Sequence, residues 1–330
     1  MDPVSHVACG RLLIQPVGHR LGRGAVAACI LGSLAPDVDL VFAPRGWDVY
    51  LRLHQGGTHS LPGAMLCGIA AGALVAMVTR RAPRRLALAG LLGAVAHVAL
   101  DLIAGADIRP FWPLLPARVS LPLFAMADPW LLAGLVLAAL LVSLRAGRFW
   151  VRLSVSLLTA LLLVKSGLYV AATRIDEKAD QVSVTRFEAV WGSLTRWMRY
   201  RAQAEMVEAT AINVRDGTAV PIARFARNLG APLAVQSRSL ATVENLLASH
   251  DITFALVRPR MDRGSDVFWS DLRYCAPAAR QRPADEPSDL ICGLWFGGEY
   301  DERARARAAV MEVGPIVQRR PVATLDPPKQ

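Results

Sequence analysis

The first half of the chain alternates long apolar stretches with short clusters of arginine. Four of these stretches lack acidic residues and arginine, and they are residues 61–79, 86–100, 129–144 and 153–172, the last interrupted only by Lys165. Stretches approaching ~20 apolar residues are long enough to cross a bilayer as helices. Two shorter apolar segments, residues 4–17 and 25–35, precede them. The pattern therefore predicts a mostly α, polytopic membrane bundle of about six helical segments.

The loops between these segments differ in charge. If the segments cross the membrane in turn, the loops on one side hold Arg20, Arg23, Arg80, Arg81, Arg84, Arg85, Arg145, Arg148 and Arg152, and those on the other hold Arg45, Arg52, Arg109 and Arg118. Arginine-rich loops stay in the cytoplasm. Both termini, and everything after residue 172, are then expected outside the cytoplasm.

The second half loses the long apolar runs and shows strand and turn signals. Residues 205–214 favour a strand, and Asp216-Gly217 is a hairpin turn signal. Residues 240–250 favour a helix, and residues 253–257, 267–269 and 290–296 favour further strands. The sequence thus predicts a membrane domain over 1–172, a small soluble α+β domain over 173–320 and a disordered tail over 321–330.

The formal charge of +10 does not indicate a nucleic-acid partner. Residues 1–172 carry 15 Lys+Arg against 7 Asp, whereas residues 173–330 carry 22 against 20 acidic residues. The excess base therefore belongs to the membrane half, where it sets topology and faces membrane lipids. The chain shows no phosphate-binding loop, nucleophile elbow or dinucleotide fingerprint.

Five cysteines are too few for a disulfide scaffold. Cys275 and Cys292 are the pair in the second half. They can be bridged if that side is oxidising, or free if it is not, and the sequence leaves both open.

Histidines and aspartates from four distant segments fall at one predicted membrane face. They are His6, Asp37, Asp39, His54, His59, His97 and Asp101. His97 and Asp101 share a helix face because they are four residues apart. Ionisable residues inside spanning helices are costly and usually functional. We interpret the seven as ligands of one or two divalent metal ions, zinc first, with manganese or iron as alternatives.

A metal at this depth suits hydrolysis of an amphiphilic substrate at the outer membrane interface. His59, Asp39 and Asp101 are then the candidate catalytic residues, with one carboxylate as general base. Two other functions stay open. A structural cluster would make the protein a non-enzymatic scaffold or regulator. A metal transporter is less favoured, because the acidic residues of 1–172 all fall on the outer side.

Four ordered motifs carry a resemblance to a known family. They are Asp2-Pro3-Val4-Ser5-His6, Leu34-Ala35-Pro36-Asp37-Val38-Asp39, His54-Gln55-Gly56-Gly57-Thr58-His59-Ser60 and His97-Val98-Ala99-Leu100-Asp101. Over residues 1–175 the chain resembles the YdjM-like family of bacterial inner-membrane proteins. The resemblance implies metal-dependent hydrolysis on a substrate that is largely undefined. Members commonly have Arg where this chain has Gln55, so Arg52 or Arg45 would have to replace it, or substrate choice differs.

Overall fold

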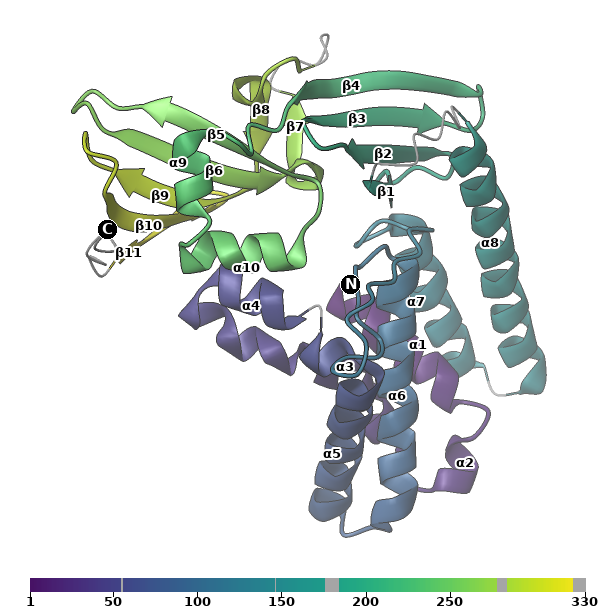
Figure 1. Cartoon of the computed structure of the whole chain (residues 1–330). Helices are drawn as coiled ribbons and strands as arrows, with labels where there is room; N and C mark the ends of the chain where they lie inside the picture. The colour runs from purple at the N-terminus through teal and green to yellow at the C-terminus, as the bar shows by residue number, and fades with distance from the viewer. Residues whose placement is uncertain (55, 146, 176–183, 278–283, 323–330) are drawn as a thin grey trace.

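The protein consists of a helical region followed by a β-sheet-rich domain packed over one end of it (Figure 1). The computed structural model describes all residues except 55, 146, 176–183, 278–283 and 323–330. The helical elements are α1 (Pro3–Ile14), α2 (Gly18–Leu21), α3 (Ala25–Leu34), the 3-10 segment η1 (Ala35–Arg45), α4 (Trp47–His54), η2 (Gly57–His59), α5 (Leu61–Thr79), α6 (Pro83–Ile103), α7 (Pro129–Leu144) and α8 (Arg148–Arg174).

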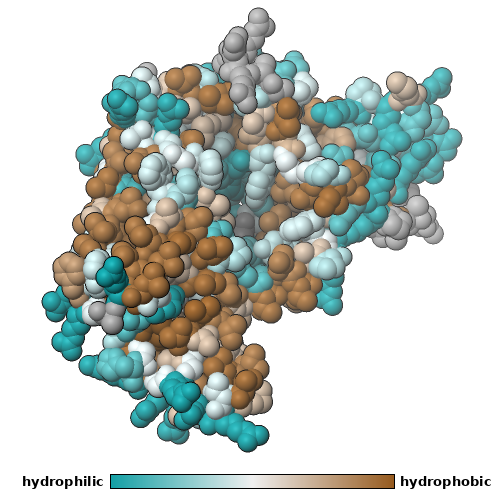
Figure 2. Space-filling model, turned by 180° about the vertical axis from the view of Figure 1, so that it is seen from behind, coloured by the Kyte–Doolittle hydropathy of each residue, from teal (hydrophilic) through white to brown (hydrophobic). Residues whose placement is uncertain are grey.

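Four helices of the described chain are long and apolar enough to cross a membrane, so the predicted count of six is not confirmed. They are Ala25–Arg45, which joins α3 and η1, together with α5, α6 and α8. The 12 residues of α1 reach about 18 Å, well short of the ~30 Å hydrocarbon core, and α7 has only 16 residues. Figure 2 shows the broad apolar surface of the helical region.

The helices begin where the sequence supplies a cap. Asp2 accepts a hydrogen bond from the Ser5 amide at 2.8 Å, and Ser60 accepts one from the Gly63 amide at 3.1 Å. Asp128 caps α7 in the same way, and each cap is followed within two residues by a proline inside the first turn. Such caps satisfy amides that would otherwise be orphaned, and proline suits the first turn. Because α1, α5 and α7 all start at the end nearest the β-rich domain, their caps lie together there.

Glycines let α3, α5 and α6 approach closely. A Cβ placed on Gly93 of α6 would meet the Cys29 carbonyl of α3, and one placed on Gly90 would meet the Gly68 carbonyl of α5. Both would lie well inside the 3.0 Å below which such contacts are essentially never found. Small residues at helix interfaces are typical of membrane bundles, where dispersion contacts replace the hydrophobic effect. This packing fixes the positions of the chain segments at the helix ends.

In the part of the chain that the structure describes, three antiparallel sheets form the β-rich domain. The first is β1 (Val184–Ala189), β2 (Arg196–Ala202), β3 (Met206–Asn213) and β4 (Thr218–Ala226), in chain order. The second has the order β11 (Ile316–Pro321), β10 (Ala306–Val313), β9 (Leu294–Tyr300), β6 (Ser265–Asp271) and β5 (Thr253–Pro259). The third is β7 (Cys275–Pro277) with β8 (Leu290–Cys292), and helices α9 (Pro232–Ser237) and α10 (Ala241–Ser249) complete the domain.

The strand predictions hold in part. The strand over 205–214 is β3, and its hairpin with β4 turns at Gly217 with a positive φ of 62°. The single strand predicted over 290–296 is wrong: Gly293 separates β8 from β9. Cys275 and Cys292 form a disulfide that joins β7 to β8, which settles the alternative left open above. Of the predicted tail, Pro321 belongs to β11, and residues 323–330 lie outside the described chain.

Polar contacts, buried or partly buried, join the β-rich domain to the helical region. Asn245 of α10 donates to Asp48 of α4 at 2.9 Å and accepts from Arg52 at 2.8 Å. Arg273 pairs with Asp107 of the α6–α7 loop at 2.6 Å. Hydrogen bonds buried from water hold their partners in one geometry. The β-rich domain therefore holds α4 in position. This helix ends at His54 and leads into the loop that carries His59.

Candidate metal centre

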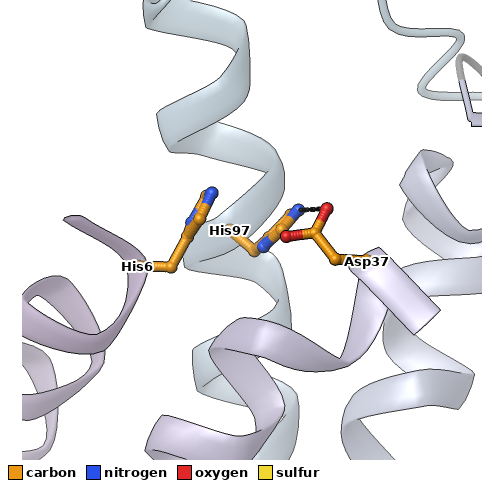
Figure 3. Close-up of side chains that lie close together, drawn as sticks. All are labelled: His6, Asp37 and His97. Carbon is orange, nitrogen blue, oxygen red and sulfur yellow. Dashed lines mark ion pairs between the residues drawn. The ribbon is translucent and has the colours of Figure 1, made fainter. Parts of the chain in front are cut away.

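The seven predicted site residues converge at the end of the helical region nearest the β-rich domain. They come from α1 (His6), η1 (Asp37 and Asp39), the end of α4 (His54), η2 (His59) and the last turns of α6 (His97 and Asp101). Overlapping groups drawn from six of them, all but Asp39, place donor atoms within 4.8 Å of one another. Figure 3 shows His97 between His6 and Asp37, its ring stacked on His6 with centroids 3.9 Å apart.

A backbone carbonyl fixes the protonation of His97. Its Nδ1 lies 2.8 Å from the Ser33 carbonyl oxygen. A carbonyl only accepts, so Nδ1 carries the proton and Nε2 presents a lone pair. The ring is fully buried, and that lone pair points at His59, Asp37 and Asp101.

Asp39 and Thr58 orient His59 in a similar way. The Thr58 hydroxyl donates to Asp39 Oδ2 at 2.8 Å and so accepts from His59 Nδ1 at 3.2 Å. In the neutral form of the ring, with its proton on Nδ1, His59 Nε2 also presents a lone pair. It lies 3.0 Å from His97 Nε2. Two lone pairs at that distance repel each other unless a positive charge lies between them.

The carboxylates concentrate negative potential on this point. Burial by itself lowers the pKa of His59, but Asp101, Asp37 and Asp39 reverse the effect and raise it to about 11. The imidazole therefore lies where a positive charge is strongly favoured. A proton or a metal ion meets that demand.

Three donor atoms lie close enough to share one position. His59 Nε2 and His97 Nε2 lie 3.0 Å apart, and Asp101 Oδ2 lies 3.4 Å from the first and 3.1 Å from the second. Zinc bonds of 2.0–2.1 Å in a tetrahedron give donor separations of about 3.3–3.4 Å. Asp37 Oδ1 lies 3.4 and 3.6 Å from the same two nitrogens, in donor groups that do not include Asp101. A bridging proton satisfies two of the three atoms, whereas a divalent ion satisfies all three.

The other oxygen of Asp101 faces His6. His6 Nε2 lies 3.4 Å from Asp101 Oδ1, and the amino group of Met1 lies 2.6 Å from the same oxygen. The geometry at His6 is not that of a hydrogen bond, and within the described chain both of its buried ring nitrogens have no hydrogen-bond partner. Asp101 can thus present one oxygen to each of two positions.

His54 lies at the margin of the cluster. Its Nδ1 contacts both oxygens of Asp39, at 3.2 and 3.1 Å, and its side chain is 23% exposed. Asp37, at 30% exposure, is the other accessible member, while His6, His59, His97 and Asp101 are about 1% exposed or less. Solvent therefore reaches the cluster from the side of Asp37 and His54.

The two arginines expected to replace an arginine at position 55 have contacts of their own. Arg52 is used by Asn245 of the β-rich domain, and Arg45 lies over the Phe42 ring, 5.3 Å from its centroid. Gln55 itself lies outside the described residues.

The comparisons with known proteins agree with the geometry in pointing to the helical region. The model of the YdjM inner membrane protein family matches residues 1–172. The chain belongs to this family. It is also 29% identical over 140 residues to the "Uncharacterized protein YfhP" of Bacillus subtilis (strain 168), covering 40% of this chain. That match spans 43% of the relative's length, and no solved structure matches the chain. Family membership and the four apolar helices make this an inner membrane protein.

Some contributors were not predicted from the sequence. The Ser33 carbonyl carries no residue signature, and the contact between Asp101 and the Met1 amino group has no motif. Thr58 contacts both Asp39 and His59 and so orients them. Ser60 donates to the Gly57 carbonyl at 2.7 Å and caps α5, so it shapes the loop.

Proposed function

We propose that the protein is a membrane-embedded, metal-dependent hydrolase. The observation that carries the proposal is the set of three donors, His59 Nε2, His97 Nε2 and Asp101 Oδ2, whose mutual separations are 3.0 to 3.4 Å, with the carboxylate of Asp37 beside them. Two imidazoles and a carboxylate suit zinc, with manganese or iron as alternatives.

The residues present fit such an ion. Three features favour a cation. The Nε2 atoms of His59 and His97 face each other, and aspartates surround them. In the described chain, both ring nitrogens of His6 have no hydrogen-bond partner. His6 with the second oxygen of Asp101 offers a second position once the Met1 ammonium, 2.6 Å from that oxygen, is displaced, so we propose one or two ions. A bound divalent ion would supply Lewis acidity, polarising an ester and making a nearby water more acidic.

The protein's own residues then divide the work. His59, His97 and Asp101 would hold the ion, and Asp39 with Thr58 keeps His59 in its metal-binding tautomer. Asp37, the accessible carboxylate, accepts the proton of the attacking water. The water oxygen forms a bond to the phosphorus of a phosphoester, and the bond to the alkoxy oxygen breaks. That oxygen leaves with the proton, so atoms and electrons balance.

We place the centre at the outer interface of the inner membrane. The arginine-rich turns between α1 and α3, α5 and α6, and α7 and α8 lie at the opposite end of the helices, and they favour the cytoplasm (Figure 1). The Cys275–Cys292 disulfide in the β-rich domain supports an oxidising compartment. A centre at that depth suits an amphiphilic phosphoester.

One observation favours a second candidate, a non-enzymatic membrane protein with a structural ion. His6, His97 and Asp101 are almost fully buried, as ligands of structural sites commonly are. A transporter finds less support, because the candidate donors all lie at one end of the bundle and the other end is rich in arginine.

The test is hydrolysis by purified full-length protein in detergent with added zinc or manganese. Chromogenic and lipid phosphoesters are compared for wild type, His59→Ala, Asp101→Ala and the control His19→Ala. His19 is exposed in α2, at the far end of the bundle. We expect loss of activity in the first two variants alone. Activity that survives both substitutions would refute the hydrolase, and metal uptake into proteoliposomes would favour transport.

A further inference from the structure

An apolar groove of about 610 Å³ runs along the helical region and reaches the candidate metal centre. Its lining residues are Pro3, Leu31, Leu34, Ala35, Asp37, Val38, Cys67, Ala70, Ala71 and Leu74. Asp37 is the only charged residue among the ten, and its Oδ1 lies 3.4 Å from His59 Nε2 of the candidate centre. The groove and the metal centre therefore share a wall.

Both walls follow the periodicity of a helix face. On α3 and η1 the lining positions are 31, 34, 35 and 38, and on α5 they are 67, 70, 71 and 74. Positions i, i+3, i+4 and i+7 face one way on a helix. The glycines of α5, Gly68 and Gly72, face α6 instead. The groove is thus the α3–α5 seam, which the small side chains Ala35, Ala70 and Ala71 leave open.

The surroundings of the groove identify its occupant. The two wall segments, Ala25–Arg45 and Leu61–Thr79, are candidate membrane spans, and Leu31 and Leu74 at the deeper end are 42% and 51% exposed. Cys67 and Leu74 are separated by about 10 Å along the helix axis. The groove therefore leads from the polar centre down into the hydrocarbon layer, and its contents can enter sideways from lipid.

We propose that this groove, named here the α3–α5 groove, holds the hydrocarbon chain of the substrate while its phosphoester lies against Asp37. This inference rests on the proposed hydrolase function and makes the substrate a lipid-like ester with a long alkyl chain. Ala70 and Ala71 then determine chain specificity, because they set the width of the groove.

The groove orients the chain and contributes little to affinity. A chain that moves from bilayer to an apolar groove exchanges one hydrocarbon environment for another, so there is little hydrophobic gain. Its value lies in aligning the ester with the metal centre. Misplacement of a reacting group by about 1 Å can cost on the order of 100-fold in rate. Blocking the groove is therefore expected to lower kcat for long chains more than it raises KM.

The test uses full-length protein in detergent and ethyl, octyl and hexadecyl 4-nitrophenyl phosphates. Ala70→Phe blocks the groove from an exposed position of α5, and Ala73→Phe is the matched control, since Ala73 is exposed on the same helix and does not line the groove. We expect Ala70→Phe to lower kcat for the hexadecyl ester on the order of 10- to 100-fold, with the ethyl ester and Ala73→Phe unchanged. An unaltered chain-length preference in Ala70→Phe would overturn the inference.

A second readout separates this inference from the hydrolase proposal. A hexadecyl phosphate bearing a photoreactive diazirine on its chain is crosslinked to the protein, and the labelled peptides are mapped. Labelling of residues 67–74 that Ala70→Phe abolishes supports the groove even where no ester is cleaved, in which case the hydrolase proposal alone fails. If Ala70→Phe leaves the labelling intact, the groove is not the substrate site. The same holds if a bilayer lipid occupies the groove and hexadecyl phosphate does not displace it.

Discussion

Replacing His97 by Gln is the most direct perturbation of the candidate centre. His97 contributes one of three donor atoms, and its Nε2 lies 3.0 and 3.1 Å from the other two. Structural zinc sites with four ligands bind with ~10–16 kcal/mol, so one ligand corresponds to roughly 3 kcal/mol. At about 1.4 kcal/mol per factor of ten, we expect zinc affinity to fall by 100-fold or more.

The assay titrates metal-free, detergent-solubilised protein with zinc against a competing chelator of known affinity, and elemental analysis gives the number of ions. His19→Gln is the matched control, because His19 is exposed and far from the cluster. Gel filtration and circular dichroism establish that both variants are folded. Zinc affinity equal to that of wild type in His97→Gln would refute the assignment. An equal loss in His19→Gln would show that the metal binds elsewhere.

Three further perturbations test the support of the candidate ligand His59, the packing of α3 against α6, and the β-rich domain. Asp39→Asn, which weakens the support of a ligand imidazole, is expected to lower zinc affinity about 10- to 100-fold while the number of ions at saturation is unchanged in elemental analysis. Gly93→Ala forces α3 from α6 and should lower the melting temperature, whereas Gly167→Ala in α8 meets nothing within 4 Å and should not. Burial raises the pKa of Glu188 from 4.5 to about 7, so ionisation of its carboxyl lowers the free energy of unfolding as pH rises through that range. Glu188→Gln should therefore stabilise the protein against urea at pH 8 and not at pH 4. The control Glu244→Gln, at an exposed position, should show no such difference.

Elements governed by local pattern were predictable from the sequence. The segment at 61–79 is bounded by a serine cap and an arginine, and α5 has the same limits. Strands β1, β2, β7, β10 and β11 were not predicted. The sequence of β2, Arg-Trp-Met-Arg-Tyr-Arg-Ala, shows why. Its arginines interrupt the apolar signal, and the strand forms because its neighbours β1 and β3 supply the hydrogen bonds.

The site was predictable as a set of residues and not as a geometry. Alternation of the helices was enough to bring His6, Asp37, His59 and His97 to one end of the bundle. The separate roles of Asp39 and Asp101 required coordinates, because both are aspartates near the same face. Asp39 lies on the Nδ1 side of His59, and Asp101 lies on the Nε2 side. Of these two aspartates, Asp101 is the one whose carboxylate lies beside the facing Nε2 atoms of His59 and His97.

The β-rich domain acts on the centre through α4. His54 ends this helix, and His59 follows it in η2. An eight-residue helix is too short to be stable alone, so its position depends on tertiary contacts. Asp48 supplies them at its start, where Asn245 and Arg320 of the β-rich domain both donate to its carboxylate. The domain thus holds two of the four histidines in place from outside the membrane region, and loss of these contacts would release the loop that completes the donor set.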